Sequence, residues 1–482
     1  MTQNHIIVMS TTNIYADSYF PGTTLFGGAF LDLRQRIDTS PMSGYQWLII
    51  ALCTFLNALD GYDVLAISFT SNAVTEEFQL TGTELGLIMS AALLGMAIGA
   101  LALGPVADRI GRRNMTIVAL LVNGAGLFLS AASNSAIELG IWRIVTGLGI
   151  GGILVGTNVL AAEYASRKHR GLAVSIYAAG YGVGASLGGT AMVGLINAFG
   201  WRSVFLLGGI MTVIALLLVV PLLPESASYL YNRQPKNAQQ KVDQIARHLG
   251  HDEPVDLTPI STPEQLREQE TGIGKLFNAQ NRRVTIVIWV TFFVIMFAFY
   301  FVNSWTPRLM NASGLSENLS MIVTVMLTLG GAIGSLVFGL FTARWATRIV
   351  LSWFTVLAAI LMTIFVFSAQ WTAVVLVLGV IVGLFINGCI AGLYVLTPQS
   401  YASGLRSTGA GWGIGIGRFG AIIAPTATGA LMDGGWTPQA IYVSVGVLIL
   451  VATVALQFMR GVDVEANRDP SQDLRKQRTS EP

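Results

Sequence analysis

Long apolar stretches recur along the chain and make up most of it. Twelve of them are long enough to cross a bilayer as a helix, which takes about 20 apolar residues. A long hydrophilic insert divides them into two groups of six. The approximate limits of the predicted spans are 46–70, 84–104, 115–133, 137–161, 172–196, 203–223, 284–305, 319–341, 348–368, 371–396, 408–432 and 438–459. The pattern predicts an all-α integral membrane protein with twelve transmembrane helices.

The hydrophilic segments between and beyond the spans set the predicted domain limits. The N-terminal extension lacks the basic region and apolar core of a signal peptide, and we expect it to be poorly ordered. The insert contains a predicted short helix around residues 238–249. The predicted parts are an N-terminal extension (1–45), an N-terminal six-helix half (46–223), a cytoplasmic linker (224–283), a C-terminal six-helix half (284–459) and a cytoplasmic tail (460–482).

Composition agrees with a membrane protein. Hydrophobic residues make up 53% of the 482 residues and charged residues 11%, with a mean hydropathy of +0.62. Soluble domains carry about 25% charged residues, so an ordinary soluble protein is excluded. The two cysteines, Cys53 and Cys389, are too few for a disulfide scaffold or a cysteine-built metal site.

The basic residues predict the orientation of the chain in the membrane. With the N-terminus inside, 24 of the 28 Lys and Arg residues lie in cytoplasmic segments. Only Arg202 and Arg308 lie outside, and Arg143 and Arg418 fall within spans. Because cytoplasmic loops carry the Lys/Arg excess, we expect both termini in the cytoplasm. The expected location is the plasma membrane, or the inner membrane of a Gram-negative bacterium.

The two halves repeat each other in sequence. The segment "GMAIGALALGPVADRIGRR" (Gly95–Arg113) overlays "GGAIGSLVFGLFTARWATR" (Gly330–Arg348) at an offset of 235. Halves of six spans each start on the same side of the membrane, so this is a parallel repeat. Alternating-access carriers are built in this way and bind their substrate between the halves.

Two acids, Asp60 and Asp63, lie inside the first span. An acid at the bilayer centre costs about 2.5–3.5 kcal/mol on insertion scales, so a functional role is favoured. Their spacing of three residues places them on one helical face. Paired carboxylates can bind and release protons, and we expect them to handle the proton. A cap or solvated end of the span is the alternative for Asp63.

Arg143 is predicted to be the partner of Asp60. Asp60 lies about 21 Å from the inner end of an outward-running helix, and Arg143 about 9 Å from the outer end of the descending one. In a core of about 30 Å these levels coincide. Protonation of Asp60 would then release Arg143. The alternative is that Arg143 reaches to the outer interface as an isolated anchor.

Arg418 lies near the middle of the eleventh span. A guanidinium there is suited to hold a carboxylate bidentately, and we expect Arg418 to bind the substrate. An ion pair within the protein is the alternative. Span seven offers an aromatic face with Tyr300 and the amide Asn303. The predicted substrate site therefore comprises Arg418, Trp412, Asn303 and Tyr300.

Several motifs carry a family resemblance. The chain contains "GPVADRIGRRN", "RIVTGLGIGG", "AEYASRKHRG" and "PESASYL", which resemble the major facilitator superfamily. The segments "IDTSPMSGYQW", "LDGYD", "GWRSVF" and "RSTGAGWGIGIGR" are similar to its aromatic acid:proton symporters. The resemblance implies the major facilitator fold and proton-coupled uptake of an aromatic acid.

The cytoplasmic loop motif implies a gate. It cannot reach a substrate at the membrane centre, and its charges resemble a latch that holds the inner gate shut in one state. Anchoring by the positive-inside rule is the alternative, against which Asp108 and Glu163 argue. The expected gate residues are Gly104, Asp108, Arg109, Gly111, Arg112, Arg113, Glu163 and Arg170.

The sequence therefore predicts a secondary transporter that couples uptake of a benzoate or hydroxybenzoate type of acid to proton entry. Rival hypotheses are a proton symporter for a sugar or nicotinate-like solute, a membrane enzyme, and a membrane sensor that transports nothing. We expect no enzymatic activity, no cofactor, no metal site and no nucleic-acid partner. The expected partners are the aromatic acid, protons and the lipid bilayer, and the expected state is a monomer.

Overall fold

The computed structural model describes residues 33–250, 273–279, 281–401 and 405–459. Every regular element in these ranges is helical, and twelve helices are long and apolar enough to cross a membrane. The predicted twelve-helix fold is thereby confirmed. The first six are α2 (Gly44–Phe69), α4 (Gly82–Ile110), α5 (Arg112–Ala132), α6 (Ala136–Glu163), α7 (Arg170–Phe199) and α8 (Arg202–Leu222). The second six are α12 (Arg282–Ala312), α13 (Glu317–Thr342), α14 (Thr347–Phe367), α15 (Thr372–Gln399), α16 (Arg406–Asp433) and α17 (Pro438–Gln457).

Five of the twelve spanning helices begin at a polar side chain that caps them: α2, α4, α6, α13 and α17. Ser43 and Gln46 form a capping box at the start of α2, and Thr81 and Glu84 form another at the start of α4. These caps satisfy backbone N–H groups that the helix itself leaves unpaired. Most of the twelve helices run a few residues beyond the predicted spans at one end or both.

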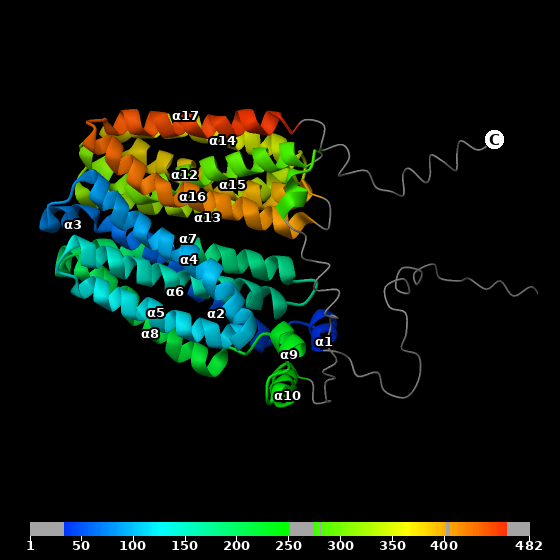
Figure 1. Ribbon diagram of the computed structural model, residues 1–482. Helices are drawn as coiled ribbons and strands as arrows, with labels where there is room; N and C mark the ends of the chain where they lie inside the picture. The colour runs from blue at the N-terminus through cyan, green and yellow to red at the C-terminus, as the bar shows by residue number, and fades with distance from the viewer. Residues whose placement is uncertain (1–32, 251–272, 280, 402–404, 460–482) are drawn as a thin grey trace, which may run out of the picture.

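The twelve helices form two halves, which Figure 1 shows as a lower layer (α2 and α4 to α8) and an upper layer (α12 to α17). Equivalent pairs pack within each half: α2 with α7 and α12 with α16, and α4 with α6 and α13 with α15. The halves touch through α4 and α16, α7 and α13, and α2 and α12. The packing therefore repeats in parallel, as the sequence predicts.

Short helices lie at both ends of the bundle. Helix α3 (Ser71–Phe78) lies at one end, and α1 (Leu33–Thr39), α9 (Ala227–Arg233) and α10 (Ala238–His248) lie at the other (Figure 1). Two single turns of 3-10 helix, η1 (Ile273–Phe277) and η2 (Ser368–Gln370), complete the described elements. Helix α10 confirms the short helix predicted around residues 238–249. We call the end with α3 the outer end and the opposite end the inner end.

Part of the N-terminal extension is ordered, contrary to expectation. In α1, Leu33 and Ile37 are buried, and the backbone N–H of Leu33 donates to Tyr231 in α9 at 3.1 Å. Asp38 pairs with Arg170 at the start of α7 at 2.7 Å. The prediction missed α1 because its few apolar residues become buried only when α9 and the start of α7 are in place. Residues 1–32 lie outside the described part of the chain.

Candidate functional site

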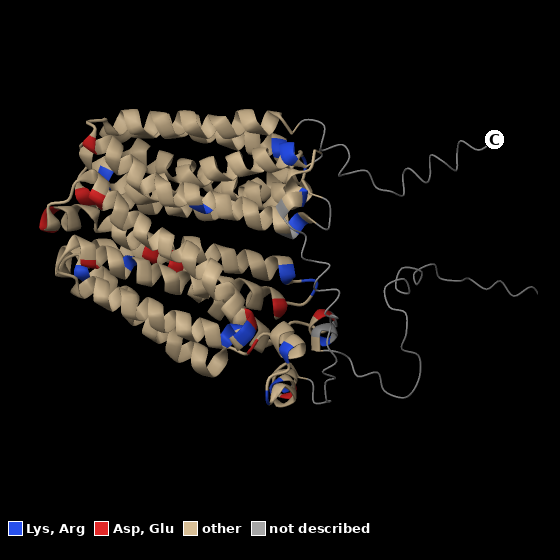
Figure 2. Ribbon diagram, in the orientation of Figure 1, with Lys and Arg blue, Asp and Glu red and all other residues tan. Residues whose placement is uncertain are grey.

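Charged residues gather at the two ends of the helices, and few lie along their middle (Figure 2). Among the described residues, four charged side chains lie well inside the spans: Asp60 and Asp63 on α2, Arg143 on α6, and Arg418 on α16. The structure separates them into two groups. One is an ion pair within the N-terminal half, and the other spans the interface between the halves.

Four side chains form the interface group, which we call the central cluster: Asp60, Tyr181 of α7, Tyr300 of α12 and Arg418. A nitrogen of the Arg418 guanidinium donates to the Tyr300 hydroxyl at 3.2 Å. The charge of Arg418 also acts on Asp60 and on Tyr181 across the interface. No direct ion pair joins Asp60 to Arg418 among the described contacts. The cluster thus places an anionic and a cationic side chain on opposite halves, with no ion pair between them among the described contacts.

Close packing of α2 on α7 positions the acid. A Cβ atom at Gly61 would collide with the backbone carbonyl of Tyr181, and one at Gly184 would collide with the carbonyl of Ala58. Glycines at these two positions therefore allow the helices to approach backbone to backbone. The close approach brings Asp60, the neighbour of Gly61, near enough to Tyr181 for the two groups to interact electrostatically.

Two polar atoms of the cluster form no hydrogen bond with any described residue. The Oδ1 atom of Asp60 is buried without a hydrogen bond, in a side chain only 7% exposed. The hydroxyl of Tyr181 is also buried and unpaired. A buried polar group without a hydrogen bond costs free energy. Both atoms are therefore poised to receive a ligand, a water molecule or, for Asp60, a proton.

Arg418 is half-buried on α16, and open space lies along the helical face that carries it. Gly415 and Gly411 precede it by three and seven residues and so share its helical face. A Cβ atom built at either glycine meets no atom within 4 Å. Tyr394 of α15, which is 46% exposed, lies within electrostatic range of Arg418 and Tyr300. A strip of accessible space therefore runs along α16 to Arg418 and is bordered by an aromatic side chain.

Arg143 pairs with Asp63 and not with Asp60. Its two terminal nitrogens donate to the two carboxylate oxygens of Asp63 at 2.6 and 2.9 Å. Arg143 is fully buried, and its guanidinium lies 5.6 Å from the centre of the Phe205 ring. The predicted Asp60–Arg143 pair is wrong because depth alone cannot separate two acids less than one turn, about 4.5 Å, apart. Asp63 faces α6, whereas Asp60 faces the other half.

Two other predicted substrate residues lie away from the cluster. The side-chain amide of Asn303 donates to the carbonyl of Phe299 in its own helix at 2.8 Å, and Asn303 is 1% exposed. Trp412 stacks on Trp289 with ring centres 6.0 Å apart. It precedes Arg418 by six residues, which turns it about 120° away on the helix. Of the predicted substrate set, the structure brings together only Arg418 and Tyr300.

The predicted gate residues form a network at the inner end of the N-terminal half. Arg112 pairs with Glu163 at 3.0 Å and approaches Asp108 at 3.8 Å. The backbone carbonyls of Asp108 and Arg109 accept hydrogen bonds from α9. Gly104 lies on α4 near Val155, and Arg170 is held by α1. In this conformation these contacts lie within the N-terminal half or between that half and the short helices α1 and α9, and none of them reaches the C-terminal half.

Glu225 lies in the segment before α9 and extends this network. It was not predicted from the sequence. Its carboxylate accepts from the backbone N–H groups of Arg113 and Ser226 at 3.0 and 2.9 Å. Ser226 in turn donates to Glu163 at 2.7 Å. Gly111, with φ of +98°, leaves room for the Glu225 carboxylate that a side chain would fill. The motif "PESASYL" was the signal, because it places an acid between a span and a polar helix.

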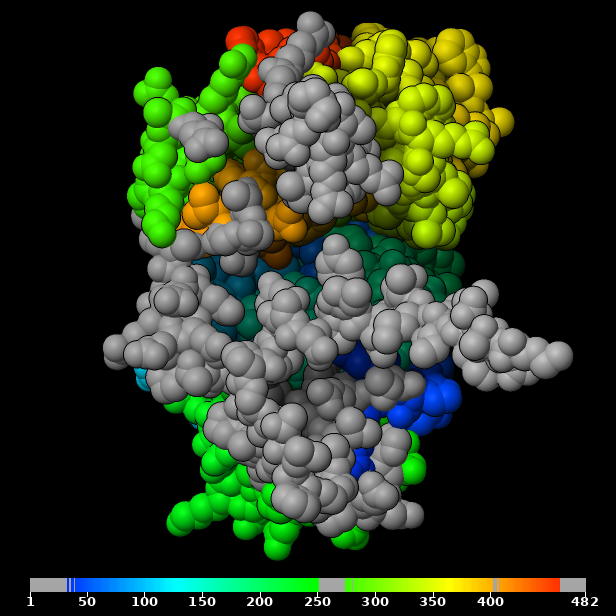
Figure 3. All heavy atoms as spheres, turned by 90° about the vertical axis from the view of Figure 1, so that its right-hand side faces the viewer, coloured from blue at the N-terminus to red at the C-terminus, as the bar shows by residue number. Residues whose placement is uncertain are grey.

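The halves are joined at the outer end. The carboxylate of Asp433 on α16 accepts from the backbone N–H groups of Gly82 and Thr83 on α4 at 2.6 and 2.7 Å. Ser90 donates to the carbonyl of Ile422, and Ser68 donates to the carbonyl of Ser304. In the described chain, hydrogen bonds between the halves lie from the membrane centre to the outer end. Figure 3 views the inner end, where teal atoms of α7 lie set back between the two halves.

Comparisons with known proteins agree with this architecture. The family model of the Major Facilitator Superfamily matches residues 50–327 and 288–480. A 4-hydroxybenzoate transporter, PcaK, of Acinetobacter baylyi is 34% identical over 84% of this chain and 89% of its own. A gallate transporter of Pseudomonas putida is 31% identical over 88% of this chain and 94% of its own. The partially occluded inward-open structure of the xylose transporter XylE from E. coli has a TM-score of 0.66 at 18% identity, covering 86% of this chain and 99% of that one.

Proposed function

The chain belongs to the major facilitator superfamily, and we propose that it imports an aromatic carboxylic acid of the benzoate or hydroxybenzoate type together with protons. The observation that carries the proposal is the position of Arg418. Arg418 lies inside the membrane span, on a helical face with open space along it, and approaches Asp60 without pairing with it. Such a guanidinium is suited to a carboxylate, which it can hold with two parallel hydrogen bonds.

Aromatic side chains around Arg418 support a planar substrate. The rings of Tyr181 and Phe299 lie 6.2 Å apart, and those of Phe299 and Tyr300 lie 5.1 Å apart in an edge-to-face arrangement. Aromatic rings arranged in this way can contact the ring of a substrate at a similar distance. Relatives named for 4-hydroxybenzoate, gallate and benzoate support the same class of cargo.

The unpaired atoms favour a ring that carries a hydroxyl group. With the substrate carboxylate on Arg418, a polar substituent on the ring would meet the unpaired Tyr181 hydroxyl or the Oδ1 atom of Asp60. A site that hydrogen-bonds a substrate hydroxyl rejects the analogue that lacks it, because its own polar groups stay unpaired. Within the proposal, a hydroxybenzoate is therefore preferred to benzoate.

Competition for Arg418 would couple the substrate to the proton. Without substrate, the cationic Arg418 on the other half favours the ionised form of Asp60, as any nearby opposite charge does. When a substrate carboxylate occupies Arg418, it neutralises that charge. A buried Asp60 without compensation then takes up a proton, because burial of an unpaired charge is costly. Release of the acid and the proton inside the cell restores the first state.

Asp63 and Arg143 belong to the proposed coupling machinery as a positioning pair. The pair joins α2 to α6 less than one turn from Asp60. It holds Asp60 toward the other half while the halves move. We assign the transported proton to Asp60 because it lacks the partner that Asp63 has.

The conformation fits one state of an alternating-access cycle. Its outer end is closed by contacts between the halves, and the described contacts of the gate network at the inner end do not reach the C-terminal half. We propose that the gate charges meet the other half when the inner end closes. The inner end is the cytoplasmic one, because it carries the excess of Lys and Arg. Both termini then lie in the cytoplasm, and the membrane is the plasma membrane.

Uptake by the purified protein in sealed vesicles tests the proposal. An imposed pH gradient, acid outside, should drive accumulation of radiolabelled 4-hydroxybenzoate at zero membrane potential, and a proton ionophore should abolish it. Benzoate, gallate, nicotinate and xylose serve as unlabelled competitors. Strong competition by xylose alone would support the sugar rival, and competition by nicotinate above the benzoates would support the nicotinate rival. Binding without counterflow would indicate a sensor.

A further inference from the structure

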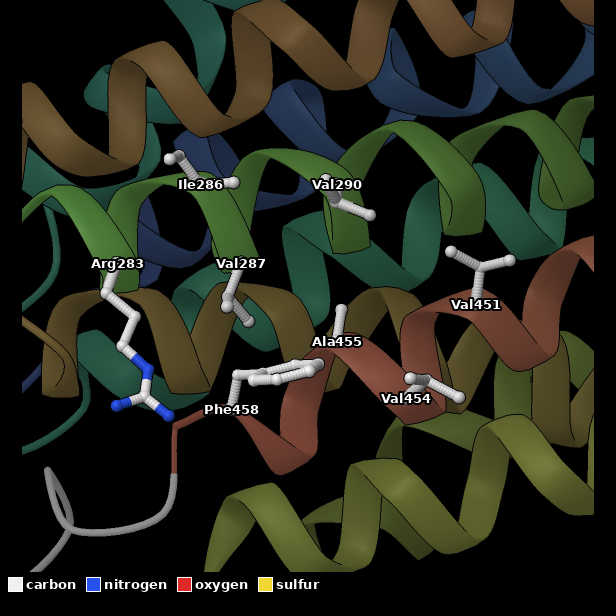
Figure 4. A pocket seen from close by; sticks show the side chains of 8 residues that line it. All are labelled: Arg283, Ile286, Val287, Val290, Val451, Val454, Ala455 and Phe458. Carbon is white, nitrogen blue, oxygen red and sulfur yellow. The ribbon is translucent and has the colours of Figure 1, made fainter.

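A shallow groove lies on the outside of the C-terminal half, between α12 and α17. Its volume is about 330 Å³. Figure 4 shows side chains from both helices pointing into it, with Phe458 lying between the helices near Arg283. Its walls include Ile286, Val287 and Val290 from α12 and Val451, Val454 and Phe458 from α17.

The groove faces the lipid and not the interface between the halves. Ile286 is 52% exposed, Val454 59% and Phe458 55%. These apolar side chains belong to helices that span the membrane, so their exposed surfaces meet acyl chains. The groove extends over about the first two turns of α12, from Arg283 to Val290. Its length of about 10 Å suits the part of one acyl chain nearest the headgroup.

One charged side chain, Arg283, lies at the inner end of the groove. It is the second residue of α12, so it lies at the level where the span meets the headgroups. Its guanidinium lies 6.0 Å from the centre of the Phe458 ring. It forms no ion pair with a described residue, and no acidic residue lines the groove. The groove thus joins an apolar wall to a cation that forms no ion pair with the described residues.

We propose that this groove binds one anionic phospholipid of the inner leaflet, with an acyl chain between α12 and α17 and the phosphate on Arg283. Basic residues at the end of a groove between spans suit an anionic headgroup. A zwitterionic headgroup would bring its own cation toward Arg283. The chain after Met459 does not fit the apolar walls, because its sequence is mainly polar.

Native mass spectrometry of the detergent-solubilised protein tests the site. The protein is titrated with phosphatidylglycerol or phosphatidylcholine, and the lipid-bound fraction is measured. Arg283→Gln should weaken binding of the first phosphatidylglycerol about fivefold, which corresponds to about 1 kcal/mol for one basic residue at an anionic surface. Arg282→Gln is the matched control, because it removes the same charge one residue away, about 100° around the helix. It should leave that binding step unchanged.

A second variant tests the apolar wall without touching the charge. Val454→Trp fills the groove from an exposed position and should weaken the first phosphatidylglycerol as much as Arg283→Gln does. Equal losses in Arg283→Gln and Arg282→Gln would overturn the proposal, since they would indicate a general attraction to basic surface. Equal affinity of the wild type for phosphatidylcholine, or no effect of Val454→Trp, would also overturn it. No residue that lines the groove belongs to the central cluster, so transport of 4-hydroxybenzoate is a separate readout.

Discussion

Arg143 holds both carboxylate oxygens of Asp63 in a pair that is almost wholly buried, with side-chain exposures of 0% and 4%. Removing one partner of a buried pair leaves an uncompensated charge, which costs about 3–5 kcal/mol. We therefore expect Asp63→Asn to lower the thermal stability of the purified protein strongly. Scanning fluorimetry in detergent measures the shift.

A double-mutant cycle separates pairing from packing. Adding Arg143→Gln to Asp63→Asn removes the second charge and should recover part of the lost stability. The exposed pair of Arg202 with Glu77 is the control, and Arg202→Gln should cost at most about 1 kcal/mol. If Asp63→Asn proves no worse than Arg202→Gln, the pair does not stabilise α2 against α6.

The closed outer end depends on Asp433, which caps the first turn of α4 from the other half. Asp433→Asn should weaken this contact by about 1.5–3 kcal/mol, because it removes a charged acceptor. The open-outward population should then rise about tenfold or more. In a Ser90→Cys background, a membrane-impermeant maleimide added outside should react faster. Glu84→Gln is the control, because Glu84 lies at the same helix end but bonds only within its own half. Unchanged labelling in Asp433→Asn would exclude a gate role for Asp433.

Glu77 of α3 predicts a pH dependence of stability at the outer end. Hydrogen bonds from the Arg202 guanidinium, followed by one from Trp201, lower the pKa of Glu77 from its ordinary value of 4.5. Its contribution is therefore complete above about pH 4.5 and is lost as the pH falls through the folded-state value. The difference in melting temperature between wild type and Glu77→Gln should be constant near neutral pH and shrink in acid. A difference that grows in acid would contradict this assignment.

The fold was predictable because its signals lie in the order of residues along the chain. Span length, the repeat at offset 235 and the Lys/Arg distribution can all be recognised without knowing which helices pack together. The pairing of Arg143 was not predictable in the same way, since Asp60 and Asp63 differ by less than one turn in depth. Which acid meets α6 depends on the rotation of α2, and Gly61 against Tyr181 fixes that rotation only in the folded protein.

Parts of the candidate site escaped prediction for a related reason. Tyr177 and Tyr181 share one face of α7 at a spacing of four residues, a pattern the sequence contains. Nothing local shows that this face meets α2 and the other half. Trp412 is close to Arg418 in sequence, but helical rotation carries it to a different neighbour, Trp289. Proximity along a helix was therefore a poor guide to membership of the cluster.

Asp60→Asn should separate substrate binding from proton coupling. The amide keeps the shape of the carboxyl group but cannot take up and release a proton. We expect exchange of labelled for unlabelled 4-hydroxybenzoate across vesicles to persist, while accumulation driven by a pH gradient is lost. Asn57→Ala, one turn earlier on α2, is the control for packing, because the side chain of Asn57 binds the Tyr177 carbonyl. Full accumulation by Asp60→Asn would remove the proton role from Asp60.

Arg418 supplies the last prediction, which distinguishes a carboxylate cargo from a neutral one. Arg418→Lys keeps the charge but loses the two-pronged geometry, so the apparent KM for 4-hydroxybenzoate should rise. Arg418→Ala removes the charge and should lower kcat/KM by about tenfold to a hundredfold or more, as expected from loss of a charged hydrogen bond of about 1.5–3 kcal/mol. Tyr300→Phe is the control, because it removes only the hydroxyl that Arg418 contacts and should act weakly. Arg418→Ala also deprives Asp60 of its nearby cation, so its residual transport should respond less to the pH gradient than that of the wild type. If Arg418→Ala carries 4-hydroxybenzoate normally and a neutral sugar competes best, the aromatic-acid proposal fails and the sugar rival replaces it.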